Sequence, residues 1–133
     1  MFNVLLATHG DLGRALLSTA GIVYGDVGEG VDAVGFVPGE SPDALLAQIR
    51  ERICASPAQG GCLVLCDIVG GSPFLMAAQA YRERPEGRPV AVVSGLNLGM
   101  LLEVLAVRDA SDLDEARETA LAAAHHSIRD LSE

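Results

Sequence analysis

Four short apolar runs alternate with segments whose apolar residues recur at helical spacing, and this alternation constrains the fold more than any other feature. The runs cover residues 3–8, 31–37, 62–66 and 90–93. Runs of this length, closed by polar, glycine or proline residues, are typical of buried strands. Strands that alternate with helices indicate a parallel sheet, because each parallel strand is reached through a crossover connection. We therefore expect an α/β fold: a doubly wound, mainly parallel sheet of about four strands with helices on both faces.

The segments between and after these runs predict helices at residues 11–24, 42–54, 73–83, 98–107 and 112–131. The dipeptides Ser41-Pro42 and Ser72-Pro73 each place a capping hydroxyl before a proline, the preferred order at a helix start. Ser111 and Asp114 have the spacing of a capping box for the last helix. Because half of the residues are hydrophobic and only 4% are aromatic, we expect a core of Val, Leu, Ile and Ala.

Composition and charge argue against two classes of partner. The net charge is −9, and the nine basic residues form no cluster, so we expect no binding to nucleic acid. No stretch approaches the ~20 apolar residues of a membrane-spanning helix, and the amino terminus lacks a signal-peptide pattern. We expect a cytoplasmic protein with no direct membrane insertion. With 133 residues and no repeat or linker, residues 1–133 are expected to form a single domain.

The cysteines offer little for a disulfide or a metal site. Cys62 and Cys66 lie in one predicted strand, which holds them ~13 Å apart at ~3.3 Å per residue, beyond the ~7 Å limit for a disulfide. With Cys54 they form no C-x-x-C pair, so we expect three buried, unreactive thiols and no metal site. His125 and His126, near the end of the last predicted helix, are expected to face solvent.

Polar residues with chemical potential follow the first and third predicted strands. His9 follows the first strand and Asp67 the third. All parallel strands end at one edge of the sheet, where ligands of open α/β proteins bind at the point of diverging connections. If these two strands are neighbours, His9 and Asp67 flank that crevice. A carboxylate bound to one imidazole nitrogen fixes the tautomer and leaves the other nitrogen free to attack.

The residues after Asp67 predict a place for an anion. Gly70 and Gly71 give an unhindered backbone before a helix start, where free N–H groups and the Ser72 hydroxyl can hold phosphate oxygens. Each residue also has a purely structural interpretation: His9 as a polar loop residue, Asp67 and Ser72 as local caps, and the glycines as a turn. Their combination at one edge favours a site with a nucleophile, an orienting carboxylate and a phosphate-binding loop.

Collinear motifs resemble one family over essentially the whole chain. They are Ala7-Thr8-His9-Gly10, Phe36-Val37-Pro38-Gly39-Glu40, Asp67-Ile68-Val69-Gly70-Gly71-Ser72-Pro73-Phe74, Leu96-Asn97 and Met100-Leu101. In these motifs the chain resembles the EIIA components of the mannose/fructose/sorbose-type bacterial phosphoenolpyruvate:sugar phosphotransferase system. The resemblance implies a phosphocarrier in which His9 accepts a phosphoryl group from HPr and passes it to an EIIB protein or domain. It also implies that Asp67 hydrogen-bonds His9, that Ser72 lies close to the phosphoryl group, that the protein is a homodimer, and that no metal or organic cofactor takes part.

The chain departs from the family pattern at two places. Ile68-Val69 is aliphatic where an aromatic residue is common, and Gly99 stands where proline is frequent. We expect these changes to affect which EIIB is recognised rather than the chemistry. A regulatory phosphorelay without sugar transport remains an alternative. So does a phosphatase or mutase with a phosphohistidine intermediate, because Thr8-His9-Gly10 resembles the Arg-His-Gly of histidine phosphatases. A third alternative is a binding module in which His9 is structural or senses a ligand.

Overall fold

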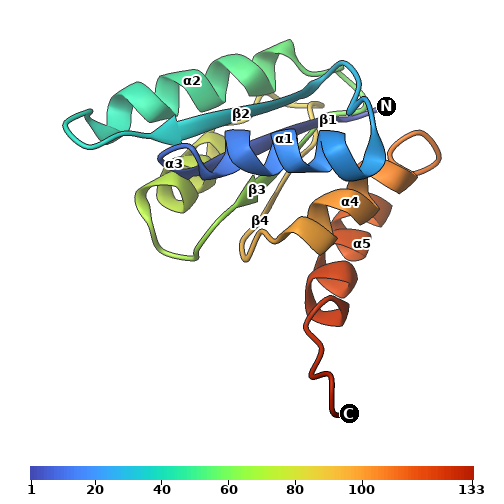
Figure 1. Ribbon diagram of the computed structural model, residues 1–133. Coiled ribbons are helices and arrows are strands. Elements are labelled where there is room, and N and C mark those ends of the chain that lie inside the picture. The colour runs from blue at the N-terminus through green and yellow to red at the C-terminus, as the bar shows by residue number, and fades with distance from the viewer.

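The computed structural model describes residues 1–133, in which strands and helices alternate along the chain (Figure 1). The strands are β1 (Asn3–His9), β2 (Val31–Phe36), β3 (Cys62–Cys66) and β4 (Val90–Val93). The helices are α1 (Leu12–Tyr24), α2 (Pro42–Ala55), α3 (Ser72–Arg82), α4 (Leu98–Val107) and α5 (Leu113–His126). The element boundaries agree closely with the prediction, except at the end of α5.

The four strands form one parallel sheet in the order β2-β1-β3-β4. β1 is central, and its Leu6 lies between Ala33 of β2 and Leu65 of β3. The chain moves from β1 to one edge through α1 and returns past β1 through α2, so the connections diverge between β1 and β3. This order confirms the predicted doubly wound sheet and the predicted adjacency of the first and third strands.

Alternate side chains of the strands enter two separate apolar layers. In β1, Val4 and Leu6 pack beneath α1, α4 and α5, whereas Leu5 and Ala7 pack beneath α2 and α3. Figure 1 shows α2 on one side of the sheet and α4 with α5 on the other. Apart from Phe2, the large and fully buried side chains are not aromatic, as the composition predicts. Burial of each contributes roughly 1.5–3 kcal/mol of hydrophobic stabilisation.

The last helix starts with a different capping box from the one predicted. The capping box joins Asp112 and Glu115, one position beyond the predicted Ser111 and Asp114 pair. The Asp112 carboxylate accepts the Glu115 N–H at 2.9 Å, and the Glu115 carboxylate accepts the Asp112 N–H at 3.1 Å. A carboxylate at this position also interacts favourably with the positive end of the helix dipole, which a serine hydroxyl does not.

The last helix also ends earlier than predicted, at His126 instead of near residue 131. Beyond it, the Asp130 side chain accepts the Ser132 N–H at 2.9 Å, which closes a turn instead of another helical turn. Ile128 and Leu131 are exposed, so no apolar contact holds this segment in a helix. A helical segment without packing contacts is only marginally stable in water, so the helix does not continue beyond His126.

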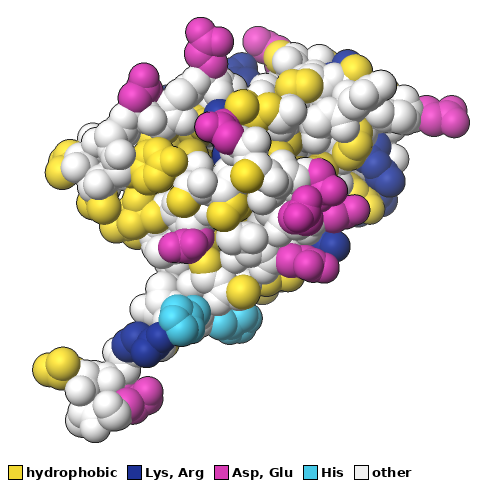
Figure 2. All heavy atoms as spheres, turned by 90° about the vertical axis from the view of Figure 1, so that its right-hand side faces the viewer, with side chains coloured by type: hydrophobic (Ala, Val, Ile, Leu, Met, Phe, Trp, Pro, Cys, Tyr) yellow, Lys and Arg dark blue, Asp and Glu magenta, His cyan; other side chains and the backbone are white.

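Figure 2 shows the end of the molecule at which the strands begin, with acidic side chains spread over it and histidines beside the projecting C-terminal segment. His125 and His126 are exposed in the last turn of α5, as predicted. None of the helices combines the length and apolar character needed to span a bilayer.

The cysteines agree with the prediction at two positions of three. Cys62 and Cys66 are buried in β3, and burial raises the pKa of each thiol to about 12. Cys54 is exposed, so the expectation that it is buried is wrong. The buried residues of α2 recur at helical spacing and include Ile49 and Ile53, which turns the next residue, Cys54, away from the sheet.

Candidate functional site

His9 ends β1, and Asp67 directly follows β3, so both residues lie at the carboxyl edge of neighbouring strands. In the pairing of β1 with β3, Ala7 lies opposite Cys66. The residues that follow Ala7 and Cys66 therefore lie close together. The two side chains therefore meet where the connections of the sheet diverge, the usual ligand position in an open α/β sheet.

His9 is bound to Asp67 by two hydrogen bonds to the same carboxylate oxygen. Nδ1 of the imidazole lies 2.8 Å from Oδ2 of Asp67, and the His9 backbone N–H donates to Oδ2 at 3.0 Å. The His9 side chain is 43% exposed, whereas that of Asp67 is 11% exposed. Because an ionised carboxylate only accepts hydrogen bonds, Nδ1 carries the proton and Nε2 presents its lone pair.

The surroundings of Asp67 favour its ionised form. Partial burial raises the pKa of Asp67, but hydrogen bonds from the His9 backbone, the His9 ring and the Ile68 N–H outweigh it, so the pKa lies below its usual value. The Ile68 N–H donates to the second carboxylate oxygen at 3.0 Å. Asp67 is therefore negative at neutral pH and can stabilise a positive charge on the His9 ring.

Two further residues confine the imidazole. Phe36 lies opposite His9 in β2 and meets it edge-on, with ring centroids 6.3 Å apart and planes at 85°. Gly71 approaches from the α3 side, where a Cβ would lie 2.7 Å from Cε1 and 3.3 Å from Nε2 of His9. Because Gly71 has no side chain, its backbone can lie close to the Nε2 side of the His9 ring.

The loop that carries Gly70 and Gly71 leads directly into α3. Gly70 has φ +83°, in the left-handed region that glycine adopts without steric cost. Gly71 is the extended N-cap and Ser72 the first residue of α3, with no side-chain capping bond. The prediction that Ser72 caps this helix is therefore wrong, because the chain enters the helix one residue earlier. Ser72 is half-buried, and its hydroxyl makes no capping bond.

Gly35 of β2 also positions His9 and was not singled out from the sequence. A Cβ at Gly35 would overlap the carbonyl oxygen of Gly10, the residue after His9. This close approach allows the Gly10 N–H to donate to the Phe36 carbonyl at 2.8 Å. A glycine inside a predicted strand commonly marks a close backbone approach, and that signal was present in the sequence.

Thr8 is the second residue that sequence reasoning did not assign to the site. It is fully buried at the end of β1. Its hydroxyl accepts the Gly13 N–H at 2.9 Å and donates to the His9 carbonyl at 3.2 Å. The available signal was a single hydroxyl at the end of an otherwise apolar run.

The chain matches the family EIIA-man, described as the PTS system fructose IIA component, over residues 3–121. The chain belongs to this phosphotransferase-system family. The assignment confirms the resemblance inferred from the motifs around His9 and Asp67.

Curated relatives and solved structures agree with this membership. The chain is 33% identical over 106 residues to the mannose-specific EIIAB component of Escherichia coli (strain K12). The aligned region covers 80% of the chain but only 32% of that protein. It is 30% identical over 133 residues to the fructose-specific EIIA component of Bacillus subtilis (strain 168), covering 100% of the chain and 88% of that protein. The crystal structure of an EIIA component from Streptococcus agalactiae superposes with a TM-score of 0.91 at 26% identity, over 99% and 98% of the two chains. The chain thus spans about a third of the mannose-specific relatives and nearly all of the fructose-specific one.

Exposed apolar side chains surround the carboxyl edge of the sheet in this EIIA-family chain. They are Leu12, Val37, Ile68 and Val69, which we call the apolar rim. They belong to the start of α1, the β2–α2 loop and the β3–α3 loop. Ile68 lies close to the His9 ring, because its Cγ1 and Nε2 of His9 would both lie 3.3 Å from a Cβ at Gly71.

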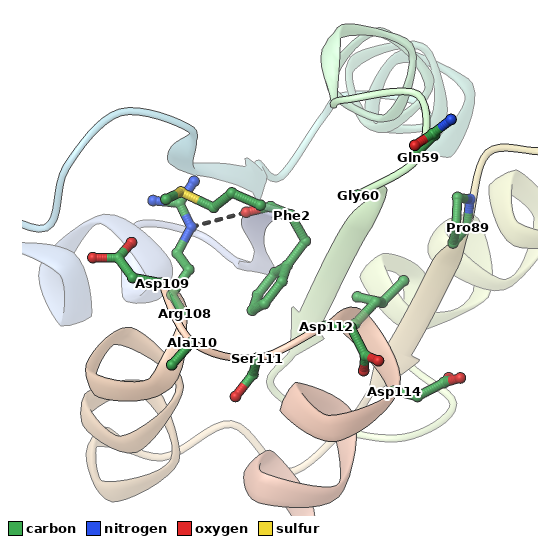
Figure 3. A pocket seen from close by; sticks show the side chains of 12 residues that line it. Phe2, Gln59, Gly60, Pro89, Arg108, Asp109, Ala110, Ser111, Asp112 and Asp114 are labelled. Carbon is green, nitrogen blue, oxygen red and sulfur yellow. Dashed lines mark hydrogen bonds between the residues drawn. The ribbon is translucent and has the colours of Figure 1, made fainter.

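A separate hollow of about 480 Å³ lies at the opposite, amino end of the sheet (Figure 3). It is lined by Met1, Phe2 and the segment between α4 and α5, and Arg108 donates from Nε to the Phe2 carbonyl at 2.8 Å. It contains no histidine or cysteine. Two of its three aspartates, Asp112 and Asp114, lie at the start of α5, where a negative charge interacts favourably with the helix dipole. We therefore place the candidate site at His9 and not in this hollow. No group of three or more His, Cys, Asp or Glu side chains is arranged to hold a metal ion.

Proposed function

We propose that this chain is a histidine phosphocarrier: His9 accepts a phosphoryl group from the phosphohistidine of HPr and passes it to an EIIB protein. The observation that carries the proposal is the His9–Asp67 pair, 2.8 Å apart, with Nε2 directed away from the carboxylate in a partly exposed ring. Membership of the EIIA-man family supports the reaction class.

In the proposed reaction, the Nε2 lone pair of His9 attacks the phosphorus atom of the donor. A new N–P bond forms at Nε2 while the N–P bond of the donor breaks, and the donor imidazole leaves with that electron pair. His9 keeps its Nδ1 proton, so the phosphorylated ring is positively charged beside the Asp67 carboxylate. Transfer to EIIB is the same in-line step, with His9 as the leaving group.

We assign Gly70, Gly71 and Ser72 to binding of the phosphoryl oxygens. The first N–H groups of a helix have no partner within it and attract anions. α3 begins at Ser72, and Gly71 lies against the Nε2 side of the imidazole. The Ser72 hydroxyl makes no capping bond, so it is free to add a donor.

The surroundings of His9 favour a carrier over a phosphatase or mutase. Arg14, the arginine nearest to His9 in sequence, is exposed and pairs with Asp11 at 3.3 Å. An enzyme acting on small phosphoesters through phosphohistidine would surround the phosphate with several arginines. The apolar rim instead suits contact with a protein, since apolar patches of this kind mark interaction sites.

Labelling with phosphoenolpyruvate, enzyme I and HPr tests this proposal. The wild type is expected to gain one acid-labile phosphoryl group per chain, His9→Ala none, and the matched control His125→Ala the same as wild type. Absence of label in the wild type, or normal labelling of His9→Ala, would show that His9 is not the acceptor.

We further propose that two copies of the chain form a homodimer through the β4 edge. β4 is unpaired on its outer side, and unpaired edges are templates for association with another chain. A hollow of about 520 Å³ lies along it, lined by apolar residues of α3 and β4 that include Phe74, Tyr81 and Val92. Sedimentation velocity is expected to give a dimer for the wild type and a monomer for Val92→Lys. A monomeric wild type at micromolar concentration would contradict the dimer.

We propose that residues 1–133 act as one cytoplasmic EIIA unit that passes the phosphoryl group to an EIIB protein or domain and uses no metal or organic cofactor. The same carrier chemistry serves sugar uptake and a purely regulatory relay. Genes for membrane components next to that of this chain would favour uptake, and their absence would favour regulation.

A further inference from the structure

Thr8 places a hydroxyl at the end of a strand whose other buried residues are apolar. Thr8 has no exposed surface. A buried hydroxyl without partners is costly, and valine would fill the same space without that cost. Both hydrogen-bonding roles of the Thr8 hydroxyl are used: it accepts from Gly13 and donates to the His9 carbonyl.

The bond to Gly13 completes the start of α1. Asp11, the N-cap of this helix, makes no side-chain capping bond. Gly13 is buried, and a Cβ there would lie 3.2 Å from Cβ of Leu6 and 3.3 Å from Cβ of Ala33. Water therefore has no access to the Gly13 N–H, and Thr8 supplies its acceptor at 2.9 Å.

The bond to the His9 carbonyl fixes the backbone of the nucleophile. The His9 N–H donates to Asp67 at 3.0 Å, and the following Gly10 N–H donates to Phe36 at 2.8 Å. The His9 carbonyl lies between these two N–H groups, and it accepts a hydrogen bond from the Thr8 hydroxyl at 3.2 Å. Three hydrogen bonds, with Asp67 after β3, Phe36 of β2 and Thr8 of β1, thus hold the peptide units on either side of the His9 Cα.

We propose that Thr8 is a positioning residue for phosphoryl transfer, acting through His9 and not on the phosphoryl group itself. Its hydroxyl couples the first turn of α1 to the His9 carbonyl, and this coupling holds the imidazole on Asp67 with Nε2 directed outward. The inference rests on the proposed phosphocarrier function. It extends that function to a residue that does not touch the reacting atoms.

The test compares Thr8→Val, which keeps the shape and loses the hydroxyl, with Thr8→Ser, which keeps the hydroxyl. Thr19→Val, an exposed threonine of α1, is the matched control. In single-turnover transfer from phosphorylated HPr, Thr8→Val is expected to lower the rate roughly tenfold at saturating donor, as misplacement of a reacting group does. The apparent Kd for the donor should be unchanged, and Thr8→Ser should recover most of the rate.

A second readout separates positioning from general stability. Long-range 1H–15N spectra report which ring nitrogen of His9 carries the proton, and Thr8→Val is expected to shift the ring toward a mixture of tautomers. If Thr8→Val does not fold, Thr8→Cys, whose thiol is a weak donor and acceptor, is expected to give an intermediate rate and spectrum. A folded Thr8→Val or Thr8→Cys with wild-type rate and wild-type ring spectrum would overturn the role of Thr8. A wild type that takes no label would instead overturn the proposed function.

Discussion

At the scale of single residues, one carboxylate oxygen of Asp67 holds both the backbone and the ring of His9. The bonds measure 3.0 Å to the backbone N–H and 2.8 Å to Nδ1. A side chain that binds both the backbone and the ring of His9 sets the position and the tautomer of the imidazole together. Substitutions at Asp67 should therefore change both stability and the rate of phosphorylation.

Asp67→Asn is expected to destabilise the fold by about 1–2 kcal/mol at pH 7, since a neutral amide replaces the charged acceptor of the His9 hydrogen bonds. Folding lowers the pKa of Asp67, so its ionised form favours the folded state. This contribution is present above the usual pKa of an aspartate, about 3.9, and is lost as the pH falls through the lower pKa of the folded state. Urea unfolding at pH 7 and at pH 3 should show a smaller difference between wild type and Asp67→Asn at pH 3. An equal or larger difference at pH 3 would contradict the assigned ionisation.

Gly71→Ala is expected to slow phosphorylation of His9 by about tenfold or more, because a displaced reacting group loses its orientation. The added Cβ would lie 2.7 Å from Cε1 of His9, so the imidazole must shift. Stopped-flow transfer from phosphorylated HPr measures the effect. Gly21→Ala is the control, because its Cβ would meet nothing within 4 Å on an exposed helix face. Equal rates for Gly71→Ala and wild type would remove the assigned role of Gly71.

The contact between His9 and Asp67 could be predicted from the sequence, whereas the parts around it could not. Both residues follow strands, and the carboxyl ends of neighbouring parallel strands meet. Gly71 is the N-cap of α3 because its backbone is extended. The Ser72-Pro73 pattern gives no information on the backbone torsions of Gly71. The close approach of Gly35 to Gly10 depended on the distance between two elements, which no local pattern contains.

At the scale of elements, α5 is stabilised at its start and unsupported beyond its end. Its first turn has a complete capping box between Asp112 and Glu115, whereas Ile128 and Leu131 beyond its end make no apolar contact that buries them. Sequence patterns predicted the helix and a capping box at its start. Two residue pairs, one position apart, have the spacing of a capping box, so spacing alone does not select between them. The choice between them is made by the register in which Leu113 and Ala116 are buried against the sheet.

Asp112→Ala is expected to lower the free energy of unfolding by about 1 kcal/mol, the usual cost of losing an N-cap. Asp112 lies at the amino end of the sheet, where it lines the hollow of Figure 3, away from His9. The rate of His9 phosphorylation should therefore be that of the wild type. Chemical denaturation and the transfer assay measure the two quantities, and a slower transfer at full folding would contradict the separation of the two ends.

At the scale of the whole molecule, the parallel pairing of all four strands places the edge with His9 and the amino end at opposite ends of the sheet. The alternation of strands and helices predicted the class of fold and the sheet of about four strands. Strand order could be inferred only from the habit of such folds, because pairing between β1 and β3 is a long-range contact. It is this pairing that turns two separate motifs into one site.

The central claim is that Nε2 of His9 carries the phosphoryl group while Nδ1 stays protonated on Asp67. The direct measurement is a 1H–15N long-range NMR spectrum of the protein phosphorylated by phosphoenolpyruvate, enzyme I and HPr. We expect a single phosphohistidine, substituted at Nε2 of His9, with the other ring nitrogen protonated. Phosphorylation at Nδ1 of His9, or at His125 or His126, would contradict it.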